Sequence, residues 1–202
     1  MAFTPMILEQ DDARFPQALG DCLGEQVPRA LTILGDAKLL QVPAVALVCS
    51  RRCPGSIILN TYDLAQRWRA EGQAVIGGFH SPMEGEVLTI LLRGRGPVIV
   101  CPARGLEGMR LKGEYRGPLE AGRLLLVSAF EASDRRATVQ AAVYRNRVVA
   151  ALAERVLVAY AAPESKTEAL CREVLGWGKA VYSLRSEHNG ALVALGAREE
   201  GA

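Results

Sequence analysis

The segment "RNRVVAALAERVLVAY" (145–160) contains the end of one helical pattern and the whole of an apolar strand pattern. The helical pattern covers residues 137–154, where apolar side chains recur along one stripe of a helix with about 3.6 residues per turn. The run "RVLVAY" (155–160) is almost continuously hydrophobic. Such a run indicates a strand that is covered on both faces. This segment therefore predicts a helix packed beside a buried strand.

The same alternation continues along the chain. Further strand patterns lie at 44–49, 73–77, 97–101, 123–130 and 179–184. Further helical patterns lie at 56–72, 85–94 and 165–178. Alternating strands and helices require right-handed crossovers between parallel strands. We therefore predict an α/β fold with a doubly wound, mostly parallel (Rossmann-like) sheet and helices on both faces. The glycine-rich stretch 103–122 instead predicts an irregular surface excursion.

Length and composition indicate a globular protein with a core of its own. The chain has 202 residues, of which 50% are hydrophobic and 23% are charged. We predict an N-terminal extension (1–42) packed on a core domain (43–202). The longest apolar runs are about strand length, well short of the roughly 20 residues that a membrane span needs. The first residues also lack the basic-then-apolar order of a signal peptide. We therefore expect a cytoplasmic protein without a membrane partner.

The charge is unevenly distributed. Residues 93–155 contain 12 basic and 6 acidic residues, whereas the formal net charge of the whole chain is only +2. A basic middle segment indicates an anionic partner, although a solvated surface has the same composition.

Small and basic residues follow the predicted strands. Ligands of such sheets gather outside the carboxyl ends of the strands. Glycines there allow close approach to an anion, and guanidinium groups match phosphate oxygens. The candidate phosphate-binding residues at these ends are Ser50, Arg51, Arg52, Gly77, Gly78, His80, Arg104, Ser165 and Lys166. Solvated loop arginines, a tight turn at the glycines and a loop histidine without function are the alternatives.

Asn146 lies on the otherwise apolar stripe of the 137–154 helix, between Arg145 and Arg147. A buried amide without a partner costs about 1–3 kcal/mol. The two arginines are about 200° apart on a continuous helix and cannot both face one ligand. We therefore predict that the helix begins or bends near Asn146, which brings all three residues to the phosphate site. The alternative is a continuous helix with solvated arginines.

The sequence offers little support for metal or catalytic chemistry. The five cysteines lack the paired spacing of a zinc site, and Cys49 and Cys101 lie inside apolar runs. There are only two histidines, His80 and His188, so a histidine-based triad is poorly supported. We expect no cofactor, no metal and no catalytic residue.

Six segments of the chain share one family pattern, namely "RFPQAL" (14–19), "LTILGDAKLL" (31–40), "VALVCSR" (45–51), "VIGGFH" (75–80), "RNRVVAALAERVLVAY" (145–160) and "NGALVALGA" (189–197). Together they resemble the Rossmann-like core of the DNA-processing protein A (DprA/Smf) family. The chain departs from the family pattern at Cys49, where the family has glycine, and in the 77–84 loop. The resemblance implies a core-only member that binds single-stranded DNA. It also implies a role in DNA uptake and recombination, delivery of DNA to the RecA recombinase, and a homodimer.

Two other functions stay open. The first is the binding of a nucleotide-derived ligand, or its hydrolysis by a phosphoribohydrolase-like enzyme. Phosphoribohydrolases with a related fold cleave nucleoside monophosphates and carry a glycine-rich segment with a downstream glutamate. The counterpart here, "APESKTEAL" (162–170), keeps Thr167 and Glu168 but lacks those glycines. The other possibility is an interaction module that has lost ligand binding.

Overall fold

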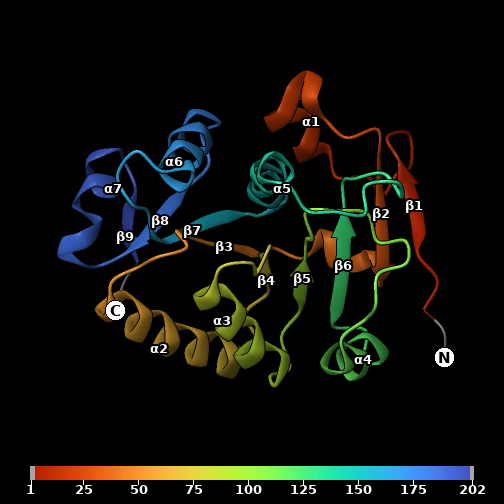
Figure 1. Ribbon diagram of the computed structural model, residues 1–202, viewed down its shortest axis with the longest axis horizontal. Coiled ribbons are helices and arrows are strands. Elements are labelled where there is room, and N and C mark those ends of the chain that lie inside the picture. The colour runs from red at the N-terminus through yellow and green to blue at the C-terminus, as the bar shows by residue number, and fades with distance from the viewer. Residues whose placement is uncertain (1–2, 201–202) are drawn as a thin grey trace.

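The computed structural model describes residues 3–200, and within them nine strands form one sheet (Figure 1). The strand order is β1-β2-β6-β5-β4-β3-β7-β8-β9. The strands are β1 (Met6–Glu9), β2 (Ala30–Gly35), β3 (Val45–Cys49), β4 (Val75–Gly77), β5 (Val98–Val100), β6 (Leu124–Ser128), β7 (Arg155–Tyr160), β8 (Val181–Leu184) and β9 (Arg198–Glu200). All pairings from β6 to β9 are parallel, whereas β1–β2 and β2–β6 are antiparallel. The predicted mostly parallel sheet is confirmed.

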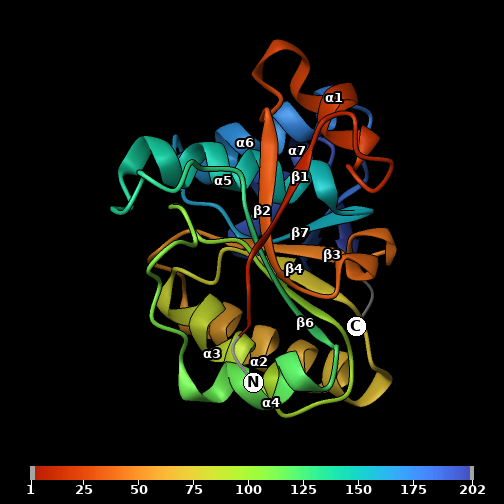
Figure 2. The same cartoon turned by 90° about the vertical axis from the view of Figure 1, so that its right-hand side faces the viewer.

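The helices cover both faces of this sheet, which confirms the doubly wound arrangement. They are α1 (Gln17–Leu23), α2 (Gly55–Glu71), α3 (Pro82–Leu92), α4 (Gly113–Glu120), α5 (Val139–Leu152), α6 (Lys166–Gly176) and α7 (Gly190–Ala194). Helices α1, α5, α6 and α7 lie on one face, and α2, α3 and α4 on the other (Figures 1 and 2). The strand order reverses between the neighbours β3 and β7, so the sheet has its topological switch point there.

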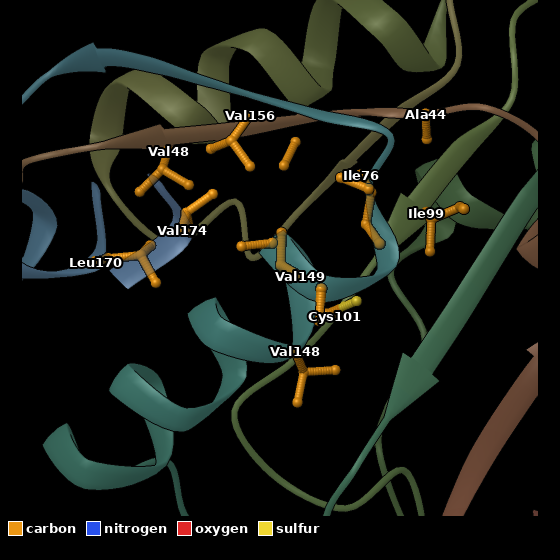
Figure 3. Packing of buried hydrophobic residues seen from close by; sticks show 14 of the residues in the cluster. Ala44, Val48, Ile76, Ile99, Cys101, Val148, Val149, Val156, Leu170 and Val174 are labelled. Carbon is orange, nitrogen blue, oxygen red and sulfur yellow. The ribbon is translucent and has the colours of Figure 1, made fainter. Parts of the chain in front are cut away.

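Alternate residues of the strands supply two cores. In β3, Ala46 and Val48 face the side of α5 and α6, whereas Val45 and Leu47 face the side of α2 and α3. Figure 3 shows the first core, where Val149 of α5 and Val174 of α6 approach the strand residues. Burial on both faces explains why the strands are nearly continuous in hydrophobicity.

The segment 1–42 contributes two strands to the sheet. β2 pairs with β6, with Thr32 opposite Ser128, and β1 pairs with the other edge of β2. The residues at the outer ends of the two predicted domains, 1–2 and 201–202, lie outside the described residues. No helix within residues 3–200 has the length and apolar character needed to span a bilayer.

The prediction of an irregular excursion over 103–122 is wrong for its second half, which forms α4. Glycine and proline both disfavour a helix interior, and Pro118 lies within α4. Tyr115 and Leu119 are buried in the core with Leu124 and Leu126 of β6. This packing outweighs the low helix propensity of the segment.

The Lys179 side chain caps the C-terminal end of α5. Its Nζ donates to the carbonyl oxygens of Ala150, Ala151 and Ala153 at 3.1, 2.5 and 2.6 Å. A cation at a helix C-terminus also interacts favourably with the helix dipole.

We expect Lys179→Met to lower the free energy of unfolding by about 1.5 kcal/mol, because three carbonyl groups lose their donor and the dipole its cation. Urea denaturation followed by tryptophan fluorescence measures this change. The same substitution at the exposed Lys38 is the control. Equal stability of the two variants would contradict a capping role for Lys179.

Candidate nucleic-acid interface

A cleft of about 610 Å³ lies at the carboxyl ends of the central strands. Gly78 directly follows β4, Val100 ends β5, and Leu126 belongs to β6. Val139 and Val143 of α5 and the loop between β5 and α4 complete the wall. The cleft therefore lies at the edge of the sheet where ligands of this fold class bind.

Positive charge dominates the wall of the cleft. Its cationic residues are Arg51, Arg104, Arg110, Lys112, Arg145 and Lys166, and His80 is also part of the wall. No aspartate or glutamate occurs among the described residues that line it. The remaining wall is largely apolar and includes Phe79, Met109 and the two α5 valines. The cleft therefore combines cations for an anion with a surface for a flat apolar group.

Arg145 is the buried cation of this cleft, with only 5% of its surface exposed. Its Nε donates to Asn146 Oδ1 and its Nη1 to the Cys101 carbonyl oxygen, both at 2.8 Å. Burial lowers the pKa of Arg145, and the neighbouring Glu84 carboxylate opposes this shift. A Cβ atom on Gly78 would overlap the Arg145 guanidinium group. Gly78 therefore makes room for the arginine.

Glu84 links the end of β3 to the 78–81 loop. It is buried, and its Oε1 accepts from the Cys49 N–H at 2.8 Å. Its Oε2 accepts from the N–H groups of His80 and Ser81 at 2.9 and 3.1 Å. Ser81 in turn caps α3 through its side chain. This carboxylate satisfies backbone donors near the cleft and fixes the loop that carries His80.

The prediction that the helix begins or bends near Asn146 is wrong, because α5 is continuous from Val139 to Leu152. The partner of the Asn146 amide is the neighbouring Arg145 side chain. Arg147 lies on another side of α5, where its Nε pairs with Glu173 Oε1 at 2.7 Å and its Nη1 contacts Gln26. As expected for a continuous helix, the two arginines do not face one ligand.

Two predicted serines lie near the switch point between β3 and β7. Ser50 Oγ accepts from the Ala162 N–H at 3.0 Å and lies 3.5 Å from Ser165 Oγ. Ser165 caps α6, where its Oγ accepts from the Glu168 N–H at 3.2 Å. Both hydroxyls thus organise the chain at the place where Lys166 begins its helix.

The structure brings seven of the twelve predicted site residues to the cleft, namely Arg51, Gly78, His80, Arg104, Arg145, Asn146 and Lys166. Ser50, Arg52, Gly77, Arg147 and Ser165 are absent from its wall. Sequence reasoning missed Arg110 and Lys112, which both lie in the loop between β5 and α4. The basic excess over 93–155 was the signal for them, but the glycine-rich composition of the stretch concealed where its cations would lie.

Comparison with known protein families gives one match over nearly the whole chain. The family model of DNA recombination-mediator protein A matches residues 6–195, nearly the whole chain. The chain belongs to this family. The resemblance noted in the sequence is therefore confirmed, and it includes both the strands of the cleft and helix α5.

Several solved structures share the fold of this chain. DNA processing protein A from Streptococcus pneumoniae has a TM-score of 0.79 at 22% identity, over 99% of this chain and 71% of that one. DNA processing protein A from Helicobacter pylori, whose structure concerns its single-stranded DNA binding mode, gives 0.77 at 22% identity, over 98% and 90%. A molybdenum cofactor carrier protein from Chlamydomonas reinhardtii gives 0.51 at 12% identity, over 79% and 89%. The search of curated proteins finds no match. At these identities the structural likeness shows the fold.

Proposed function

We propose that this chain binds single-stranded DNA in the cleft at the carboxyl ends of β4, β5 and β6. The observation that carries the proposal is the wall of the cleft, with six cationic side chains and no acidic residue among those described. Lys and Arg side chains that neutralise phosphates supply most of the affinity in binding of this kind. Membership of the DNA recombination-mediator protein A family supports the same ligand.

We expect the cationic and the apolar residues of the cleft wall to contact different parts of the DNA. Arg51, Arg110 and Lys112 are exposed, so they can meet phosphate groups along a strand. Met109 and Val143 offer an apolar surface to a base. A base can reach that surface only when it is unpaired and unstacked, because its faces are covered within a duplex. We therefore expect the protein to prefer single strands and to depend little on their sequence.

Hydrolysis of nucleoside monophosphates is less well supported by the cleft. The candidate carboxylate for that reaction, Glu168, accepts from Arg172 Nη2 at 2.8 Å and from the Glu164 N–H at 2.6 Å. Glu168 does not line the cleft. A titration with nucleoside monophosphates tests this alternative, and turnover would favour the enzyme over the DNA-binding protein.

The wider role is proposed from the family alone. We propose that the chain acts in DNA processing and recombination, including DNA uptake, by delivering the bound strand to the RecA recombinase. We also propose that it forms a homodimer. Co-sedimentation with RecA and light scattering at micromolar concentration test these two parts separately.

The proposed phosphate contacts predict a salt-dependent affinity. Each neutralised phosphate contributes about −0.7 to the slope of log affinity against log salt, so about three phosphates give a slope of roughly −2. Fluorescence anisotropy of a labelled oligothymidylate, measured over a series of salt concentrations, gives this slope. Arg110→Ala should make the slope shallower by about 0.7.

The control is Arg67→Ala, because Arg67 is an exposed arginine on α2, on the opposite face of the sheet from α5. It should bind like the parent protein. An affinity that does not change with salt would rule out the phosphate contacts, and equal affinity for duplex DNA would rule out the role of the apolar wall.

A further inference from the structure

A second hollow, which we call the amino-edge hollow, lies at the opposite edge of the sheet from the cleft. It has a volume of about 430 Å³ and is lined by the end of α2 (69–72) and by the segment 93–95, which follows α3. These two segments lead into β4 and β5, whereas the cleft lies where both strands end. Helices α2 and α3 pack against each other on one face of the sheet (Figure 1). The amino-edge hollow is therefore separate from the cleft.

Three arginines dominate the wall of the amino-edge hollow. Arg69 belongs to α2, and Arg93 and Arg95 follow α3. All three are exposed, and Glu71 is the one acidic residue among the described residues of the wall. No carboxylate within residues 3–200 forms an ion pair with any of the three guanidinium groups. Three arginines and one glutamate give the wall a formal charge of +2.

Two glycines let the segments of the wall approach each other closely. A Cβ atom on Gly96 would lie 2.7 Å from the Gly72 carbonyl carbon. A Cβ atom on Gly94 would lie 2.8 Å from Arg69 Cγ. A larger residue at either position would push the 93–96 segment away from the end of α2. The close packing therefore brings the arginines of the two segments to one hollow.

Helix capping does not account for the charge of the amino-edge hollow. The last carbonyl oxygen of α3, Leu92 O, accepts from Arg123 Nη2, and the carbonyl groups before it accept from backbone N–H groups. Arg93 and Arg95 are therefore not needed as caps. The dipoles of α2 and α3 together correspond to about one negative charge at this end. These dipoles and Glu71 do not balance the arginines.

We propose that the amino-edge hollow binds a chain of phosphate groups. Guanidinium groups match phosphate oxygens with paired hydrogen bonds, and an anion between the arginines relieves their mutual repulsion. Three arginines around about 430 Å³ suit several linked phosphates better than a single one. The linked phosphates can belong to a DNA strand or to a free polyphosphate. The basic excess of residues 93–155, which the cleft uses only in part, includes two of these arginines.

Helix α3 connects the amino-edge hollow with the cleft. Its first turn adjoins the 78–81 loop, and its last turn leads into the 93–95 segment. Its 11 residues make it about 16 Å long. A strand held in the cleft must extend by about five nucleotides, at about 3.4 Å each, to cover this length. A DNA strand as the ligand rests on the proposed function, and it should reach the amino-edge hollow only when it is long.

Strand length separates the contribution of the amino-edge hollow from that of the cleft. The double variant Arg93→Gln/Arg95→Gln should make the slope of log affinity against log salt shallower by about 1.4 for a thymidylate 20-mer, at about 0.7 for each lost phosphate contact. The slope for a thymidylate 5-mer should not change, because this strand occupies the cleft alone. Fluorescence anisotropy of the labelled strands gives both slopes.

Lys38→Gln/Arg67→Gln is the charge-matched control. It removes two positive charges from exposed positions outside both the cleft and the amino-edge hollow, and it should leave both slopes unchanged. Equal changes for the 5-mer and the 20-mer in Arg93→Gln/Arg95→Gln would overturn a contact between the long strand and the amino-edge hollow.

Calorimetry with tripolyphosphate tests the amino-edge hollow without DNA. Arg93→Gln/Arg95→Gln should bind one tripolyphosphate fewer than the parent protein, whereas the charge-matched control should bind as many as the parent. This loss without a change in the 20-mer slope would assign the amino-edge hollow to a free polyphosphate. An unchanged result in both measurements would overturn the proposal. If the parent does not bind the 5-mer but still loses a tripolyphosphate site in the double variant, the proposed function fails and the amino-edge hollow stands.

Discussion

Replacing Arg145 by methionine is expected to lower the free energy of unfolding by about 2–3 kcal/mol, because two acceptors beside a buried side chain lose their charged donor. The guanidinium group is buried near the Glu84 carboxylate, which is itself buried. Its removal takes a charged donor from both the Cys101 carbonyl oxygen and Asn146 Oδ1. Affinity for single-stranded DNA should fall at least tenfold, because the cleft wall loses its fixed cation.

Arg147→Met is the matched control for this prediction. The two arginines are two residues apart on α5, but Arg147 makes a partly exposed ion pair with Glu173. Such pairs contribute about 0–1 kcal/mol, and Arg147 does not line the cleft. Urea denaturation should therefore separate the variants clearly. Similar stability and similar DNA affinity of the two variants would show that Arg145 has no special role.

The sequence predicted those parts of the fold that are buried on both sides. The strands β3 to β8 are apolar and short, so their pattern is unambiguous, and α5 and α6 follow with clear periodicity. β2 was missed because its residues alternate in burial and it pairs antiparallel with β6. α4 was missed because its stability comes from the burial of Tyr115 and Leu119, which local composition does not reveal.

The candidate site was predictable where residues lie in the first few positions after a strand. Gly78, Arg104 and Lys166 belong to this class, since topology alone places them at one edge of the sheet. Arg110 and Lys112 reach the same cleft through a long loop, and sequence does not specify the path of a loop. The partner of Asn146 was also missed, because the rotamer of the adjacent Arg145 depends on the room that Gly78 provides.

Because Arg145 depends on this room, we expect Gly78 to be the second position of the cleft where a substitution strongly lowers stability and DNA binding. Gly78→Ala is expected to lower the free energy of unfolding by about 3 kcal/mol, because the new methyl group overlaps the Arg145 guanidinium and overpacking costs about 1–3 kcal/mol. Gly78 has no positive φ, so the cost is one of space and does not come from backbone strain. The displaced arginine should also weaken DNA binding about as much as Arg145→Met does.

Gly85→Ala provides the control within the same region. Gly85 lies in α3, and a Cβ there meets nothing within 4 Å. Alanine should therefore stabilise this helix by about 0.5–1 kcal/mol, opposite in sign to the change at position 78. Loss of stability in both variants would mean that the region tolerates no added methyl group, and the argument from Arg145 would fail.

A double-mutant cycle tests whether overlap with Arg145 causes the loss of stability expected for Gly78→Ala. If the methyl group at position 78 acts through the guanidinium, Gly78→Ala should cost less than about 1 kcal/mol once Arg145 is methionine, because a flexible side chain can move aside. The coupling energy between the two positions should then be about 2 kcal/mol, within the range found for residues in contact. Additive costs would place the strain elsewhere in the 78–81 loop and would separate Gly78 from the cation of the cleft.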